Sequence, residues 1–227
     1  MKRQSLKFYQ EKYKGDIGHA FEKSFLTKRK LLSAIRLYDE KNFDKALKTL
    51  SDLQKKCKLK CDLYTVGLFM ALALTDMGSE QQAINVYTVL INEGLVLPNI
   101  CQNLGNLCQK LGNHDGAIQA YQLSIQSDSR DPIAYNNLAK LFFDTGDMQS
   151  AKKHALKALE LNHKMPEPAV TLALIYTLED DQANIEKYYR IATANGYRPE
   201  ALNGVIGIYR SAMIKSGKVP EPIEEEI

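Results

Sequence analysis

The sequence predicts an all-α fold, an α-solenoid in which pairs of helices repeat along the chain. Three observations predict this fold. Apolar residues recur with the period of a helix in one segment after another. Short breaks that contain glycine or asparagine separate these segments. The whole pattern returns after 34 residues, so that Pro98, Pro132 and Pro166 stand in register, each suited to the first turn of a helix.

The pattern is clearest between Pro132 and Met165. The first of its two apolar stripes has residues at i, i+3, i+4 and i+7, namely Tyr135, Leu138, Ala139 and Phe142. The break that follows contains Gly146, which can adopt the positive φ that ends a helix. The second stripe consists of small residues at helical spacing, namely Ala151, Ala155 and Ala158. Large side chains on one helix and alanines on the other allow close packing, and neither helix could bury its stripe alone.

The same positions are filled one step upstream and one step downstream. In the unit that begins at Pro98, they hold Cys101, Leu104, Gly105 and Cys108 on the first helix and Ala117, Tyr121 and Ser124 on the second. In the unit that begins at Pro166, they hold Ala169, Leu172, Ala173 and Tyr176, then Ile185, Tyr189 and Ala192. Three units in phase and without a gap indicate a genuine repeat.

This pattern resembles the tetratricopeptide repeat, a helix–turn–helix unit of the same period. The resemblance implies a right-handed α-solenoid of about five such repeats, whose first helices line the concave side. We place the repeats at residues 27–60, 64–97, 98–131, 132–165 and 166–199.

Helical caps are expected at both ends of the array, because a terminal repeat has one open apolar face. The N-terminal cap would be the basic segment 1–26. The C-terminal cap would be a helix over 200–216, whose inner side carries Leu202, Val205, Ile206 and Tyr209. Residues 217–227 form an acidic tail with two prolines, for which we expect disorder.

The composition is that of an ordinary soluble folded chain. Hydrophobic residues make up 44% of the sequence and charged residues 25%. The N-terminal segment lacks the apolar core of a secretion signal, and the longest apolar stretch, residues 67–74, is too short to cross a membrane. We therefore expect a cytoplasmic protein.

The net charge of +3 hides an asymmetry along the chain. Residues 1–60 contain 17 Lys and Arg against 7 Asp and Glu, whereas the remaining residues contain 13 against 20. A basic end can attract RNA, an anionic membrane surface or an acidic partner. Binding of nucleic acid or an anionic surface through the first 60 residues is therefore an alternative function. Acidic residues interspersed among the basic ones also fit a simple solvated face.

The sequence carries no recognisable catalytic or metal-binding motif. The four cysteines, Cys57, Cys61, Cys101 and Cys108, do not have the spacing of a zinc site, and the last two fall on packing positions. The four histidines are dispersed, and no phosphate loop or hydrolase motif occurs. The acidic run at 179–181 falls in a turn between helices. We expect no enzymatic activity, no metal and no cofactor.

The resemblance also implies which residues bind a ligand, because the family presents certain first-helix positions to the concave groove. At these positions the third repeat carries Asn99, Gln102, Asn103 and Asn106, and the fourth carries Asn136, Asn137, Lys140 and Phe143. Apolar residues flank them, with Phe69 and Leu72 on one side and Val170 and Leu174 on the other.

A primary amide offers two donors and one acceptor, so these side chains can pair with the main chain of a peptide whatever its sequence. An amide centre between apolar flanks suits an extended peptide or a helix laid along the groove. The sequence leaves open that the amides only face water or bond to neighbouring repeats. Lys140 is the only cation at the central positions, which argues against the basic carboxylate clamp of the members that bind chaperone tails.

We therefore predict a non-enzymatic scaffold or adaptor that binds a protein or peptide in its concave groove. Nucleic acid is the less favoured partner, and insertion into a membrane is not expected. Self-association through the convex side or an uncapped end is a third alternative.

Overall fold

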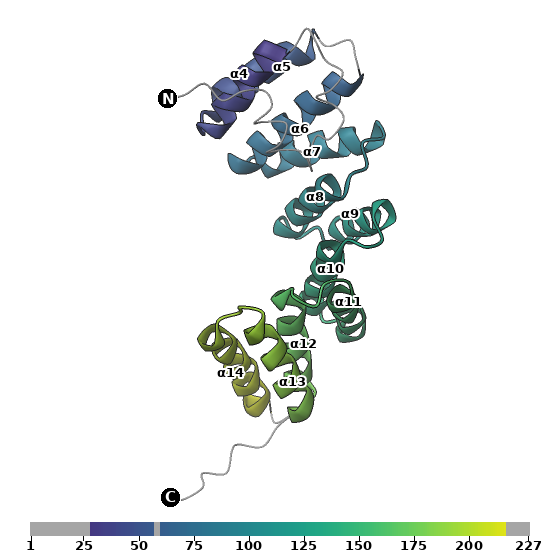
Figure 1. Cartoon of the computed structure of the whole chain (residues 1–227), viewed down its shortest axis with the longest axis vertical. Helices are drawn as coiled ribbons and strands as arrows, with labels where there is room; N and C mark the ends of the chain where they lie inside the picture. Colours follow the sequence, from purple (N-terminus) through teal and green to yellow (C-terminus); the bar gives the residue numbers. More distant parts are fainter. Residues whose placement is uncertain (1–27, 57–59, 217–227) are drawn as a thin grey trace, which may run out of the picture. The chain divides into compact units, whose positions relative to one another are not determined.

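A computed structural model of the chain describes residues 28–56 and 60–216 (Figure 1). All regular elements within these ranges are α-helices, which confirms the predicted all-α fold. The expected N-terminal cap at 1–26, the expected tail at 217–227 and Cys57 lie outside the described residues.

The helices belong to two compact units, with the division between Ser129 and Arg130. The first unit contains α4 (Lys28–Asp39), α5 (Phe43–Gln54), α6 (Lys60–Asp76), α7 (Glu80–Asn92), α8 (Pro98–Lys110) and α9 (His114–Ser127). The second contains α10 (Pro132–Thr145), α11 (Met148–Leu161), α12 (Pro166–Leu178), α13 (Gln182–Ala194) and α14 (Pro199–Lys215).

Within each unit the helices pack as hairpins, and each hairpin packs on the next. In the first unit α4 packs on α5, α5 on α6, α6 on α7, α7 on α8 and α8 on α9. In the second unit α10 packs on α11, and α12 packs on α10, α11, α13 and α14. Each helix pair thus buries its apolar residues against its neighbours, which is the packing of a solenoid.

The starts and ends of the helices follow the predicted frame. Pro98, Pro132 and Pro166 each occupy the first turn of a helix, in α8, α10 and α12. Proline suits this place because the N–H that it lacks would have no partner within the helix. After α10 the chain turns at Gly146, whose φ of +87° is the left-handed conformation that the sequence predicted.

The second helices differ in what they bury. In α11 the predicted stripe is fully buried and consists of Ala151, Ala155 and Ala158. In α9 the corresponding stripe includes Tyr121 and Ser124, which are also fully buried. A buried hydroxyl needs a hydrogen-bond partner, whereas a buried alanine needs none. This difference decides how the polar residues of the adjacent first helices are used.

α14 turns one apolar side toward the rest of the second unit. This side carries Leu202, Val205, Ile206 and Tyr209. Leu202 is fully buried, and the other three side chains are partly buried against apolar residues of the second unit.

Candidate partner-binding surface

In the first unit the amide side chains of α8 are largely engaged with neighbouring helices. Asn103 donates from Nδ2 to the hydroxyl of Tyr87 on α7, at 3.3 Å. Gln102 donates from Nε2 to the hydroxyl of Ser124 on α9, at 3.5 Å. The carbonyl of Asn106, which is exposed, accepts from the hydroxyl of Tyr121 at 2.7 Å. These bonds support the alternative in which the amides of α8 join neighbouring helices.

The two apolar residues expected beside these amides differ in accessibility. Leu72 is half-buried, but Phe69 is 0% exposed. The ring of Phe69 meets the ring of Tyr38 of α4 edge-on, with centroids 6.0 Å apart, and it lies in the core of the first unit. We therefore leave Phe69 out of the surface proposed below, because a ligand cannot reach its ring.

In the second unit the polar side chains of α10 have unused hydrogen-bonding capacity. Asn136 is 9% exposed, and its buried Oδ1 has no hydrogen-bond partner. Asn137 is half-buried and Lys140 is exposed, and neither side chain bonds to any of the residues that the structure describes. A buried polar atom without a partner destabilises a fold by about 1–3 kcal/mol, so each case calls for an explanation.

The repeat itself explains why α8 and α10 differ. Gln102 and Asn136 occupy the same repeat position, as do Asn106 and Lys140. Ser124 and Tyr121 supply hydroxyls to the two residues on α8. At the matching positions of α11 stand Ala158 and Ala155, which have no hydroxyl to offer. The alanine stripe of α11 therefore leaves Asn136 and Lys140 of α10 without the partners that α9 gives to Gln102 and Asn106 of α8.

The apolar residues expected beside α10 are covered by the chain itself. Val170 is half-buried and Leu174 is buried, and both lie in the cluster to which α14 contributes Val205, Ile206 and Tyr209. Phe143, at the C-terminal end of α10, belongs to the same cluster.

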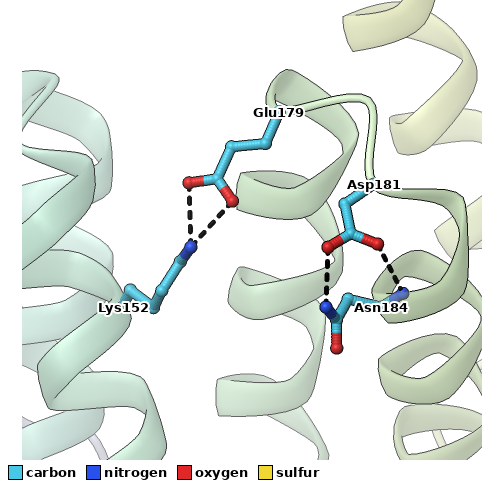
Figure 2. A network of polar contacts seen from close by, with 4 residues as sticks. All are labelled: Lys152, Glu179, Asp181 and Asn184. Carbon is cyan, nitrogen blue, oxygen red and sulfur yellow. Dashed lines mark hydrogen bonds and ion pairs between the residues drawn. The ribbon is translucent and has the colours of Figure 1, made fainter.

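The acidic run at 179–181 has structural partners, as Figure 2 shows for two of its residues. Glu179 binds the amine of Lys152 with both carboxylate oxygens, at 2.8 and 2.7 Å. Burial of Lys152 by itself would lower the pKa of its amine, but the hydrogen bonds and charge of Glu179 outweigh this effect and raise the pKa. Lys152 also lies 4.2 Å from the ring centroid of Tyr176. Asp181 caps α13 by accepting from the backbone N–H of Asn184 at 3.1 Å.

The cap on α13 leads to a prediction about acid stability. Hydrogen bonds from the side chain and backbone of Asn184 lower the pKa of the Asp181 carboxyl below its usual range. The charged carboxylate therefore stabilises the fold at neutral pH, and this contribution is lost as the pH falls through the lowered pKa. Asp181→Asn, which keeps a capping side chain, should make the melting temperature less dependent on pH between about pH 2 and pH 5. Thermal unfolding followed by circular dichroism checks this, and identical pH profiles for the two proteins would contradict it.

The described ranges contain no group of three His, Cys, Asp or Glu side chains that could hold a metal ion. Cys101 and Cys108 are unpaired and buried, and burial raises the pKa of both thiols, that of Cys101 to about 11. None of the helices in residues 28–56 and 60–216 has the length and apolarity that a membrane crossing requires.

Two features of this surface were not evident from the sequence. The unpartnered Oδ1 of Asn136 could have been suspected only by comparing Ser124 with Ala158 across two repeats. The side chains that cover Val170 and Leu174 come from α14, and the spacing of Leu202, Ile206 and Tyr209 indicates an apolar side but not what it packs against.

Comparison with known proteins gives two matching family models. One, described as a TPR repeat, matches residues 105–146, and the other, the tetratricopeptide repeat, matches residues 133–164. No curated protein shows significant sequence similarity to the chain.

Several solved structures share the fold at low sequence identity. MamA aligns with a TM-score of 0.66 and 17% identity, over 71% of this chain and 93% of MamA. A tetratricopeptide repeat protein from Parabacteroides merdae aligns with a TM-score of 0.70 and 16% identity, over 84% of this chain and 73% of that one. YrrB, described as a TPR protein with an unusual peptide-binding site, aligns with a TM-score of 0.63 and 11% identity, over 92% of this chain and 98% of YrrB. At these identities the likeness shows a common fold.

Proposed function

The chain is a tetratricopeptide repeat protein, and we propose that it is a non-enzymatic scaffold that holds a segment of a partner protein against α10. Stacked helical repeats of this kind present extended surfaces to other proteins. The peptide-binding site for which YrrB is described supports peptide recognition on this fold. The repeat array with its boundaries at 27 and 199 would be the unit of this scaffold.

The observation that carries the proposal is the unused hydrogen-bonding capacity of α10. Asn136, Asn137 and Lys140 lie within five consecutive residues of one helix, and the alanines of α11 offer no hydroxyl to Asn136 or Lys140. A side chain that served only to join helices would have a partner, as Asn103 and Asn106 do on α8. Asn137 and Lys140, which reach the surface, are therefore better explained as partners for a group outside the chain.

The chemistry of these side chains defines the kind of segment that they would bind. The amide of Asn137, which is half-buried, can both donate to and accept from a peptide unit. Asn136 is 9% exposed and its Oδ1 is buried, so it belongs to the proposed surface without offering this carbonyl to the partner. The amine of Lys140 pairs with a carboxylate, of an acidic side chain or of a C-terminus. In the first unit, Asn106 of α8 keeps its amide NH₂ group for a contact of its own, while its carbonyl bonds to Tyr121. Asn99, Gln102, Asn103 and Leu72 remain proposed binding residues of the first unit, described separately from α10.

Replacing Asn137 separates a binding role from a structural one. Peptides selected by phage display against the full chain should bind the Asn137→Ala variant about threefold to tenfold more weakly, because one or two hydrogen bonds are lost. The melting temperature should be unchanged, since Asn137 bonds to none of the described residues. Fluorescence anisotropy measures the affinity.

Asn103→Ala is the matched comparison on the preceding repeat. The Asn103 amide bonds to Tyr87, so its loss should lower the free energy of unfolding by about 0.5–1.5 kcal/mol. If neither variant changes peptide affinity, the amides have no role in binding and the proposed surface is wrong.

Ionic strength separates this function from the alternative, in which the basic first 60 residues bind nucleic acid or an anionic surface. Contacts with phosphates release counterions, so such binding weakens steeply as the salt concentration rises. Binding through amides and a single lysine should depend little on salt. A steep salt dependence that Asn137→Ala does not alter would favour the alternative.

A further inference from the structure

The last helix departs from the stacking of the helices before it. α8 packs on α7, and α12 packs on α11, so that each first helix follows the second helix of the preceding pair. α14 instead packs mainly on α12, the first helix of the preceding pair. Along its middle, α14 is separated from α13 by a pocket of about 180 Å³, whose lining includes Ile185 and Tyr189 of α13 and Ile206 and Arg210 of α14.

The surface that α14 covers belongs to first helices. The ring of Tyr209 meets the ring of Phe143 of α10 edge-on, with centroids 5.5 Å apart. Val205, Ile206 and Tyr209 lie in one apolar cluster with Phe143, Val170 and Leu174. We call Phe143, Val170 and Leu174 the α10–α12 face. This face adjoins the polar residues of α10 along the same helix, so a helix of the chain itself occupies the apolar part of the proposed binding surface.

α14 is held less firmly than the other helices of the second unit. It contains Gly204 and Gly207, and glycine inside a helix disfavours the helical state. Of its seventeen residues, Leu202 and Met213 are buried. Among the described residues, no side-chain hydrogen bond or ion pair joins α14 to α10, α11, α12 or α13. Apolar contact alone therefore keeps α14 in place.

We propose that α14 is a displaceable occupant of the α10–α12 face, and that the partner segment which replaces it is an amphipathic helix. Such a helix would present large apolar side chains at i, i+4 and i+7, the spacing of Leu202, Ile206 and Tyr209 in α14. The proposal rests on the proposed function, since it places the apolar part of the partner beside the polar residues of α10. A partner without internal glycines has a higher helix propensity than α14 and can compete with it.

Competition with α14 sets the apparent affinity of the partner. Only chains in which α14 has left the face can bind. The smaller the fraction of such chains, the weaker the apparent affinity for the partner. A substitution that stabilises α14 in place should weaken binding, and one that loosens α14 should strengthen it. Gly204 and Gly207 permit the first kind of change, because a Cβ at either position would meet no atom within 4 Å.

The experiment uses the full chain and a fluorescein-labelled peptide with the sequence of residues 199–215 that carries Gly204→Ala and Gly207→Ala. In the full chain, Gly204→Ala and Gly207→Ala should each weaken binding of this peptide by about fivefold. Tyr209→Ala should strengthen it by about tenfold, because the contact with Phe143 is lost. Ile208→Leu is the control, since Ile208 is 69% exposed on the other side of α14. The affinity of this variant for the peptide should stay within about twofold of that of the wild type.

Hydrogen exchange gives a second readout that does not depend on affinity. Peptide binding should accelerate amide exchange in α14 of the chain and leave the exchange of α13 unchanged. The glycine variants stabilise a helix, so misfolding cannot imitate their expected effect. Any of three results would overturn the proposal. The glycine variants could bind the peptide as tightly as the wild type, Tyr209→Ala could fail to bind it, or amide exchange in α14 could stay unchanged with the peptide bound.

The measurements on Asn137 distinguish the two proposals. If selected peptides depend on Asn137 while the α14 variants behave like wild type, the proposed function stands and the displacement of α14 is wrong. If the α14 variants behave as expected while Asn137→Ala has no effect, the α10–α12 face binds a helix and the amide surface of α10 is wrong.

Discussion

Replacing Leu138 with alanine is expected to lower the free energy of unfolding by about 2–5 kcal/mol. Leu138 is 0% exposed in the middle of α10, on which both α11 and α12 pack. The buried residues of α11 are alanines, which are too short to fill the cavity that the substitution would create. Urea denaturation followed by far-ultraviolet circular dichroism measures the change.

A second leucine of the same unit provides a matched control. Leu156 of α11 is 42% exposed, so Leu156→Ala should change the free energy of unfolding by no more than about 0.5 kcal/mol. If Leu138→Ala were as mild as Leu156→Ala, the assignment of apolar positions to the interior of the second unit would be wrong.

The frame of the repeats could be predicted because it depends on local chemistry. Proline at 98, 132 and 166 restricts where a helix can begin, and Gly146 supplies the positive φ at which α10 ends. The periodicity of apolar residues then indicates which side of each helix is buried. These signals act within a few residues, so a single sequence contains them in full.

The neighbours of each buried side could not be predicted in the same way. α6 and α12 are apolar on nearly every side, so periodicity does not tell whether a residue such as Phe69 faces a ligand or the core. The ring of Tyr38 from α4 covers Phe69. The same limit applies to α14. Its apolar side indicates that some other part of the chain covers this side, but the packing of α14 on α12 depends on how whole helices pack and cannot be inferred from periodicity.

The candidate site was predicted in its residue types but not in the way that these residues are used. Amides at equivalent positions of α8 and α10 look alike in the sequence. Their roles differ because the partners on the following helix differ, with Ser124 on α9 and Ala158 on α11. A hydrogen bond between helices depends on a pair of residues that lie twenty-two positions apart, so neither residue reveals it alone.

Replacing Gly105 with alanine is expected to destabilise the first unit, although it adds only a methyl group. A Cβ at position 105 would lie 2.7 Å from Cδ1 of Tyr121 and closer still to Cε1. The Tyr121 hydroxyl is held by Asn106 at 2.7 Å and Gln109 at 3.1 Å, so the ring cannot move aside without breaking these bonds. Gly105→Ala should therefore lower the free energy of unfolding by about 1–3 kcal/mol, although alanine is the better helix former. Gly207→Ala, where a Cβ has open space, should have the opposite sign.

A double-mutant cycle tests whether the ring of Tyr121 is the cause. Tyr121→Ala alone should cost about 3–5 kcal/mol, because a large buried side chain is lost. Gly105→Ala combined with Tyr121→Ala reproduces the pair found in the next repeat, Ala139 and Ala155, both of which are fully buried. In that background the clash is absent. The loss of unfolding free energy in the double variant should therefore be smaller, by at least about 1 kcal/mol, than the sum of the losses in the two single variants. Strict additivity would mean that α8 and α9 do not approach each other at Gly105, and the tight packing of this repeat would have to be explained by other contacts.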